Sequence, residues 1–401
     1  MHRTISTRDA ATNSKTIEFP SLQVFRGWAA SLVLLFHASY LARTELKTPF
    51  LHDYFAFGSG GVDFFFVLSG FIICYLNYDD IGRPEKARLY LTKRLVRIYP
   101  IYWIITLILL PVYFAVPQFG RGDETHLSVI FGSLFLVPIS RVPILNAGWT
   151  LVHEMFFYIV FAGLIVCRGK WMLALVFVWG TTVLAWAIIH FNVAYYPTNP
   201  WLKVLLWPQN LEFLLGCIAA VILRRVRRIS VRLSAIVLTV CLIAALLIPF
   251  LPEEFLSFNR GKHVFVYGGL AFLIVISSTA LERCGTDFVS ILPTPFRRPM
   301  LYLGDASYSL YLVHAPSVAL LLKLTFIFGL SAMLGGTTVT LLAIITALIA
   351  GCGCHEFIEK PLLKRLRPLL VAKAKGSRGS IPPPLPLSVD FVHEAHRPIS
   401  E

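Results

Sequence analysis

LQVFRGWAASLVLLFH, residues 22–37, is the stretch of sequence that decides the fold class. It belongs to an apolar run over 23–42, and about 20 such residues cross a bilayer core as an α-helix. Arg26 and His37 interrupt the run. Charged and titratable residues are rare inside membrane spans and usually functional. The stretch therefore indicates a membrane helix that carries chemistry.

The composition of the whole chain supports this interpretation. The 401 residues are 56% hydrophobic and only 14% charged, with a mean hydropathy of +0.70, whereas soluble domains are about 25% charged. The net charge is +14, and seven cysteines are too sparse for a disulfide framework. These values exclude a soluble nucleic-acid-binding protein, a disordered chain and a secreted disulfide scaffold. They leave an all-α polytopic membrane protein.

Ten apolar stretches have the length of a membrane span. They are 23–42, 60–77, 98–117, 150–167, 171–190, 203–223, 233–251, 264–281, 304–326 and 331–353. A shorter stretch, 127–139, is interpreted as a re-entrant or interfacial piece. No cleavable signal peptide is expected, because the first 22 residues are polar and the run that follows is too long.

The distribution of Lys and Arg predicts the orientation of these spans. With the N-terminus inside, 27 of the 36 basic residues fall in cytoplasmic segments and seven fall in outer segments. This bias follows the positive-inside rule and predicts that both termini are cytoplasmic. We expect an N-terminal segment over 1–22, a ten-helix membrane domain over 23–353 and a cytoplasmic, largely disordered tail over 354–401.

Arg26 and His37 are eleven positions apart on the first helix. Eleven steps of 100° end about 20° past three full turns, so both side chains fall on one face, about 16 Å apart along the axis. Arg26 lies near the cytoplasmic end and His37 in the outer half. Alternatively, Arg26 extends to the headgroups and His37 only bonds a neighbour. The alignment favours a functional polar stripe.

Two carboxylates are predicted at the depth of His37. Asp63 begins the second span and Glu154 the fourth. A carboxylate that orients a histidine is the usual arrangement for a general base, and the sequence does not choose between the two. The other interpretations are a helix cap for Asp63 and an interfacial role for Glu154. His153 is interpreted as interfacial.

A cavity is expected around His37 and the two carboxylates, and three further side chains are assigned to its wall: Trp149, Tyr308 and His314. The last two belong to SYSLYLVH on the ninth span. Its hydroxyl groups equally suit hydrogen bonds that hold helices together.

Arg94 and Arg97 lie three positions apart at the cytoplasmic start of the third span, and so share one helical face. Two guanidinium groups are suited to phosphate, although the positive-inside bias also explains them. Cys352, Cys354 and His355 have no second Cys/His pair nearby, so no metal site is expected.

Six stretches of the sequence together resemble acyltransferase family 3 of integral membrane O-acyltransferases, the type that modifies O-antigen, exopolysaccharide and nodulation factors. The resemblance covers residues 20 to about 365. The elements, in order, are LQVFRGWAASLVLLFH, GVDFFFVLSGFII, TKRLVRIYPIYW, WTLVHEMFFY, SYSLYLVH and FIEKPLLK.

The resemblance implies transfer of an acyl group, expected to be acetyl, from cytoplasmic acyl-coenzyme A to a hydroxyl of a glycan or glycolipid at a bacterial inner membrane. It places the family's Arg and His on Arg26 and His37, its RxxR pair, which contacts the coenzyme, on Arg94 and Arg97, and its Glu on Glu154. His37 is then the general base, with Asp63 or Glu154 as its orienting group. Acyl-coenzyme A is a co-substrate, the other partners are the acceptor and membrane lipid, and no bound cofactor or nucleic acid is expected. A proton-coupled transporter or flippase for a lipid-linked glycan is the alternative, since buried His, Asp and Glu also form proton relays.

Overall fold

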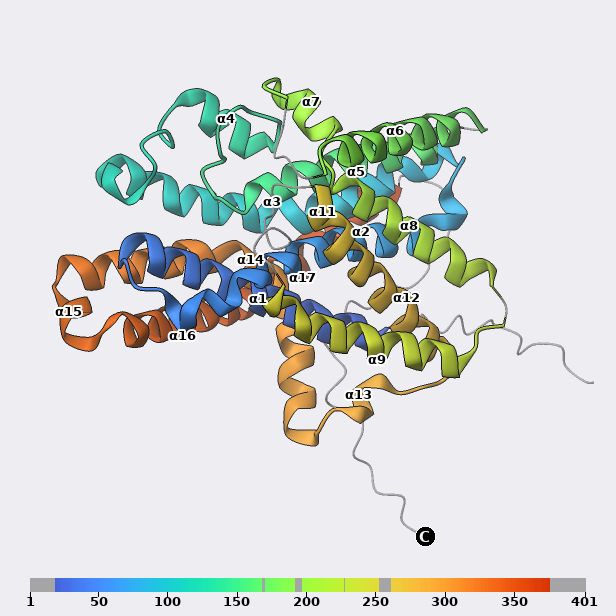
Figure 1. Cartoon of the computed structure of the whole chain (residues 1–401). Coiled ribbons are helices and arrows are strands. Elements are labelled where there is room, and N and C mark those ends of the chain that lie inside the picture. Colours follow the sequence, from blue (N-terminus) through green and yellow to red (C-terminus); the bar gives the residue numbers. More distant parts are fainter. Residues whose placement is uncertain (1–18, 168–169, 192–196, 227, 252–260, 376–401) are drawn as a thin grey trace, which may run out of the picture.

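The computed structural model describes residues 19–167, 170–191, 197–226, 228–251 and 261–375, and these residues form helices and connecting loops without any β-strand. Ten helical stretches are long and apolar enough to cross a membrane. The predicted all-α polytopic fold is confirmed (Figure 1).

The helices run as follows. They are α1 (Pro20–Glu45), η1 (Phe50–Ser59), α2 (Gly60–Asn77), η2 (Tyr78–Asp80), α3 (Pro84–Ala115), η3 (Pro117–Phe119), α4 (Leu127–Phe135), α5 (Gly148–Val166), α6 (Lys170–Ile189), α7 (Pro200–Leu205), α8 (Asn210–Arg225), α9 (Val231–Leu247), η4 (Ile248–Phe250), α11 (Gly261–His263), η5 (Val264–Gly268), α12 (Gly269–Arg283), α13 (Phe288–Ile291), α14 (Thr294–Ile327), α15 (Leu330–Leu334), α16 (Gly336–Cys354), η6 (His355–Glu359) and α17 (Lys360–Lys375).

Several helix boundaries differ from the apolar runs. Helix α3 begins at Pro84 rather than at 98, so Arg94 and Arg97 belong to the helix itself. The span expected over 203–223 is broken between α7 and α8, where Pro208 lacks the N–H that a continuous helix needs. Helix continues beyond 353 through η6 and α17. The parts 1–18 and 376–401 of the expected terminal segments lie outside the described residues.

Glycines set the closest helix contacts. A Cβ atom on Gly304 of α14 would lie 2.1 Å from the carbonyl oxygen of Gln23 in α1, and one on Gly27 would lie 3.0 Å from the Gly304 nitrogen. At the crossing of α2 and α8, a Cβ on Gly216 would lie 2.0 Å from the Val67 oxygen. Inside a membrane the hydrophobic effect does not drive helices together, and small residues allow the close packing that holds them in contact. These crossings fix the register of α1 on α14 and of α2 on α8.

Helix α4 ends against the middle of α3. Its last carbonyl groups accept hydrogen bonds from aromatic side chains of α3: Tyr99 to Phe135 O (2.9 Å), Tyr102 to Ser133 O (3.0 Å) and Trp103 to Leu134 O (2.8 Å). Helix ends leave carbonyls unpaired, and in a membrane they must find donors inside the protein. The C-terminal carbonyl groups of α4 are therefore paired within the protein.

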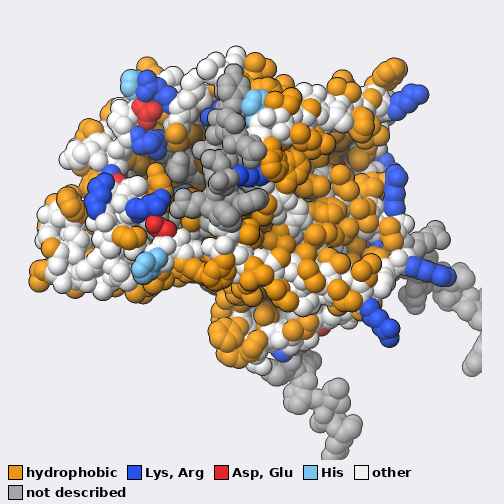
Figure 2. Space-filling model, viewed as in Figure 1, with side chains coloured by type: hydrophobic (Ala, Val, Ile, Leu, Met, Phe, Trp, Pro, Cys, Tyr) orange, Lys and Arg blue, Asp and Glu red, His pale blue; other side chains and the backbone are white. Residues whose placement is uncertain are grey.

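The outer surface suits a lipid environment. Figure 2 shows hydrophobic side chains over the part of this face where α6, α8 and α9 lie in Figure 1, with Lys and Arg at the right-hand rim. Many large apolar side chains of α6 and α9 are exposed, including Trp171, Phe177 and Leu246. The chain is a multi-pass membrane protein, because such surfaces are otherwise unstable in water.

Cysteine accessibility tests the predicted orientation. Cys167 after α5 and Cys284 after α12 are both exposed, at ends that the charge bias places in the cytoplasm. In spheroplasts, a membrane-impermeant maleimide should label neither until the membrane is permeabilised. The control is His126→Cys, an exposed position before α4, which should react at once. Labelling of Cys167 or Cys284 in intact spheroplasts would refute the orientation.

Candidate active site

A cavity of about 430 Å³ opens between helices of the bundle. We call it the histidine cavity, because His37 of α1, His153 of α5 and His314 of α14 all line it. Trp149 also lies in its wall, as does the chain between α4 and α5. Three residues predicted to share a cavity, His37, Trp149 and His314, therefore meet there. The lining also includes Ser59, Arg141, Lys203, Trp207 and Tyr311.

His37 and His314 are in direct contact. His37 Nδ1 lies 3.1 Å from His314 Nε2 and 3.0 Å from the carbonyl oxygen of Val33, while His314 Nδ1 lies 3.1 Å from the Leu310 oxygen. Because a carbonyl only accepts, we assign the proton of each ring to Nδ1. His314 Nε2 is then an acceptor for His37, and His37 Nε2 carries a lone pair. An unprotonated nitrogen is what a general base requires.

Neither predicted carboxylate contacts His37 among the described residues. Glu154 accepts hydrogen bonds from Ser69 Oγ (3.1 Å) and from the Tyr158 hydroxyl. Asp63 Oδ1 lies 3.2 Å from Nδ1 of His263. The orienting partner of His37 is thus another imidazole, supplied by a helix that the sequence gives no reason to pair with α1.

Four arginines gather at the other end of α1. We call Arg26, Arg94, Arg97 and Arg367 the basic cluster; the electrostatic contacts of Arg26 and Arg367 connect them. Arg94 lies over the rings of Tyr90 and Tyr158, at 5.7 and 5.8 Å. Arg97 lies 5.5 Å from the Tyr308 ring and 3.6 Å from Glu359 Oε1.

The basic cluster holds more positive than negative charge. Glu359 also accepts from Ser309 Oγ (2.7 Å) and contacts His355 Nδ1 (2.8 Å), so it is shared among several donors. Arg94 has a buried Nε without a hydrogen-bond partner, and no ion pair to it occurs among the described residues. Positive charges held close together repel one another, and a bound anion would relieve this repulsion. Arginine binds phosphate well.

Tyr308 lies beside the basic cluster, against Arg97, and not among the residues that line the cavity. Its hydroxyl donates to the Ile98 oxygen at 3.0 Å. Tyr311, one turn further along α14, lines the cavity and is 2.9 Å from Thr150 Oγ1. Glu154 follows Thr150 by one turn of α5 and interacts electrostatically with Arg26 and Tyr308. Polar side chains therefore connect the histidine cavity with the basic cluster.

Sequence reasoning missed several residues of the cavity. Lys203 of α7 and Trp207 lie at the break between α7 and α8. Pro208, within the apolar run, could have indicated this break in the sequence. His153, interpreted from the sequence only as interfacial, also lines the cavity: its side chain is buried and its ring lies 5.2 Å from that of Trp207. No signal marked Arg141, because the loop that carries it has no regular period. The described residues contain no cluster of His, Cys, Asp and Glu suited to a metal ion.

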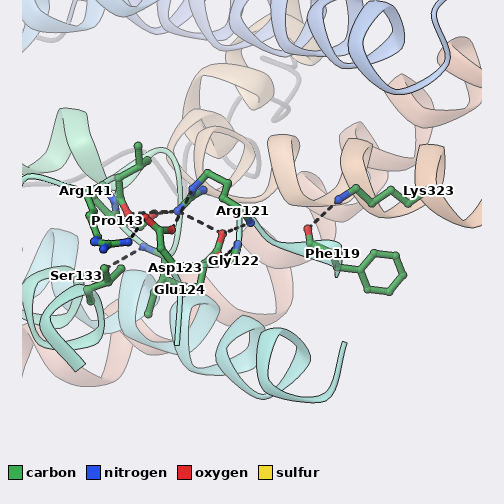
Figure 3. Close-up of polar contacts among 12 residues, drawn as sticks. Phe119, Arg121, Gly122, Asp123, Glu124, Ser133, Arg141, Pro143 and Lys323 are labelled. Atoms are coloured by element: carbon green, nitrogen blue, oxygen red, sulfur yellow. Dashed lines mark hydrogen bonds and ion pairs between the residues drawn. The ribbon is translucent and has the colours of Figure 1, made fainter. Parts of the chain in front are cut away.

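The chain between α3 and α5 is fastened by its own polar contacts (Figure 3). Glu124 accepts from the amides of Arg121 (2.8 Å) and Gly122 (3.0 Å). The Arg121 side chain donates to the Pro143 oxygen (2.9 Å), and the Ile144 amide donates to Ser133 Oγ (2.9 Å). These bonds hold the cavity-lining residues 137–143 in one shape.

Known proteins are similar to this chain in sequence. A family model described as "Acyltransferase domain" matches residues 19–355. The exopolysaccharide production protein ExoZ of Rhizobium meliloti is 29% identical over 354 residues, which cover 86% of this chain and 100% of ExoZ. Acyltransferase MdmB of Streptomyces mycarofaciens is 25% identical, covering 89% of this chain and 96% of MdmB.

A third relative is longer than this chain. The peptidoglycan O-acetyltransferase OatA of Listeria monocytogenes is 25% identical over 325 residues, which cover 75% of this chain but 49% of OatA. No solved structure gives a significant match.

Glu124 provides a test of the loop. Burial alone would raise the pKa of Glu124, but the amide donors and the Arg121 guanidinium outweigh it and hold the pKa below its usual value. A lowered carboxyl pKa means that ionised Glu124 stabilises the fold above pH 4.5, and that this contribution is lost as the pH falls through the lowered pKa. Glu124→Gln should therefore raise amide hydrogen exchange in residues 121–147 about tenfold at neutral pH.

The control is Glu45→Gln, an exposed position at the end of α1, which should leave this exchange unchanged. Equal exchange in Glu124→Gln and the wild type at pH 7 would show that the carboxylate does not hold the loop.

Proposed function

This chain belongs to the acyltransferase family that its residues 19–355 match, and we propose that it moves an acyl group from acyl-coenzyme A, bound at the basic cluster, to a hydroxyl of a glycan or glycolipid in the histidine cavity. It is a membrane O-acyltransferase. The observation that supports the proposal best is the contact between His37 and His314. It leaves His37 Nε2 with a lone pair at a cavity that polar side chains connect to the half-buried arginines of the basic cluster.

His37 acts as the general base. Its Nε2 takes the proton of the acceptor hydroxyl, and the oxygen attacks the acyl carbon; the bond between acyl carbon and sulfur breaks, and the coenzyme leaves as a thiol after receiving a proton. His314 keeps His37 in the required tautomer through the contact at 3.1 Å. A positioned base contributes about 10²- to 10⁴-fold to a rate.

The basic cluster binds the phosphates of the donor. Coenzyme A carries several phosphate charges, and Arg94, with no carboxylate partner in the described chain, is the best placed ligand. Arg26, the member of the cluster that shares a face of α1 with His37, lines the path of the pantetheine arm. The donor then enters from the cytoplasmic side that the charge distribution predicts.

The acceptor is a sugar. Aromatic rings of Trp149, Trp207 and Tyr311 line the cavity, and such rings offer the flat apolar surfaces on which sugar rings stack. The names of ExoZ and OatA refer to exopolysaccharide and peptidoglycan. Acetyl is the proposed group, as in the name of OatA, and the bacterial inner membrane is the proposed location.

Replacement of His37 tests the base. In membrane vesicles supplied with labelled acetyl-coenzyme A, His37→Ala should lower acyl transfer by at least about 10²-fold, because the variant lacks the base that takes the proton of the acceptor hydroxyl. The control His126→Ala alters an exposed histidine outside the cavity and should keep wild-type activity. Near wild-type transfer by His37→Ala would exclude His37 as the base.

Replacement of Arg94 tests the donor site. Arg94→Ala should raise the KM for acetyl-coenzyme A by about 10- to 100-fold, the loss expected for a charge-assisted bond, and leave the KM for the acceptor unchanged. With S-acetyl-pantetheine, which lacks the nucleotide phosphates, wild type and variant should have similar KM values. Arg88→Ala, an exposed arginine of the same helix, is the control. An equal rise in KM for both donors would contradict phosphate binding by Arg94.

A further inference from the structure

A second buried polar cluster lies behind the wall of the histidine cavity. Its members are Ser59, the last residue of η1 and the N-cap of α2, Asp63 in the first turn of α2, His263 of α11 and Glu212 of α8. Asp63, Glu212 and His263 are fully buried, and Ser59 is 4% exposed. Ser59 alone of these four also lines the cavity. The cluster therefore reaches the cavity through one hydroxyl.

Such a cluster is expensive to bury. Two carboxyl groups and an imidazole lose their hydration when they are buried, and apolar residues of the same size would often be at least as stable. Titratable groups inside a membrane domain mark functional positions. The transfer step assigned to His37 does not use these side chains.

The contacts have a definite order. Ser59 Oγ lies 3.5 Å from His263 Nε2, and His263 Nδ1 lies 3.2 Å from Asp63 Oδ1. This is the order of groups that activates a serine nucleophile: the serine hydroxyl faces Nε2 of an imidazole, and Nδ1 of the same ring faces a carboxylate. The Ser59–His263 distance is at the long end of hydrogen-bond reach, and the His263–Asp63 contact is within ion-pair distance but lacks hydrogen-bond alignment. Catalytic hydrogen bonds are often long or poorly aligned before substrate binds.

Glycines and an altered helix position the two halves of the cluster. A Cβ atom on Gly60 would lie 2.0 Å from the ring of Tyr267, and one on Gly61 would lie 2.5 Å from the Ala29 oxygen. The start of α2 thus touches both α1 and the segment after His263. That segment, η5, is a π-helix, a form that recurs at functional sites. Glu212 faces Asp63 from α8.

We propose that Ser59 is a nucleophile that carries the acyl group between donor and acceptor, with His263 as its base and Asp63 as the group that orients His263. The proposal rests on the acyl transfer proposed above and divides it into two steps, with Ser59 acylated by the donor and deacylated by the acceptor. Ser59 and His37 line one cavity, so one acyl group can meet both.

The chemistry balances in each step. First, Ser59 Oγ attacks the thioester carbonyl, an ester bond forms and the carbon–sulfur bond breaks; His263 Nε2 takes the serine proton and gives it to the departing thiolate. Next, the acceptor hydroxyl gives its proton to His37 while its oxygen attacks the acyl-serine carbonyl. The Ser59 ester bond breaks, and the proton returns to Ser59 Oγ. No oxidant, metal or further reactant takes part.

A trapping experiment tests the intermediate. Purified protein in lipid nanodiscs is mixed with labelled acetyl-coenzyme A without acceptor, quenched in acid, digested and analysed by mass spectrometry. We expect an acetyl group on Ser59, a burst of free thiol that approaches one per protein, and loss of the label when acceptor is added. Ser59→Ala should lose the label and lower transfer at least about 10²-fold.

Two variants separate a nucleophile from a structural hydroxyl. Ser59→Cys keeps a nucleophile, so it should acquire a thioester that neutral hydroxylamine removes, unlike the more resistant serine ester. Ser31→Ala, which removes a hydroxyl bonded within α1 to the Gly27 oxygen, should label and turn over as wild type does.

The outcomes are distinct. Wild-type turnover without label on Ser59, label on His37 instead, or transfer by Ser59→Ala within a few-fold of wild type would each overturn the role of Ser59 and leave the acyltransfer intact. A wild-type protein that neither cleaves acetyl-coenzyme A nor acylates any acceptor would overturn both proposals.

Discussion

The close contact between α1 and α14 is the constraint on which the site depends. Gly27 and Gly304 allow the two backbones to touch. Ten residues separate Gly27 from His37, and ten separate Gly304 from His314. Each histidine therefore lies about 15 Å along its helix from the glycine contact. Because the two distances are equal, the glycine contact also brings the two histidines together. A larger residue at either glycine would separate the helices and shift this register.

The interior of the bundle is organised by depth. The arginines lie at one end, with Glu359 and Tyr158 beside them; Glu154 lies one turn further along α5, and Thr150 and the histidines lie beyond it. Charges within a membrane protein are tolerated when each has polar neighbours of suitable sign. The sequence of levels suits a donor whose phosphates stay with the arginines while its acyl end reaches the histidines. One chain of polar groups thus satisfies both stability and the proposed reaction.

The cavity wall combines rigid and irregular parts. Helices supply His37, His314 and Trp149, while the fastened loop 137–143 and the break at Trp207 supply the remaining wall. Catalytic groups on helices keep a fixed geometry, whereas loops vary among relatives without disturbing the scaffold. This division fits a family whose members carry names as different as exopolysaccharide production and peptidoglycan O-acetylation.

The sequence by itself determined the fold class, the ten spans, the family resemblance and the common face of Arg26 and His37, because length, hydropathy and helical period are local properties. It did not show that His37 meets His314, that Asp63 meets His263, or that Arg367 of the expected tail joins Arg94 and Arg97. Those pairs come from helices far apart in the chain. They form only where helices cross, and the position of a crossing depends on the packing of both partners.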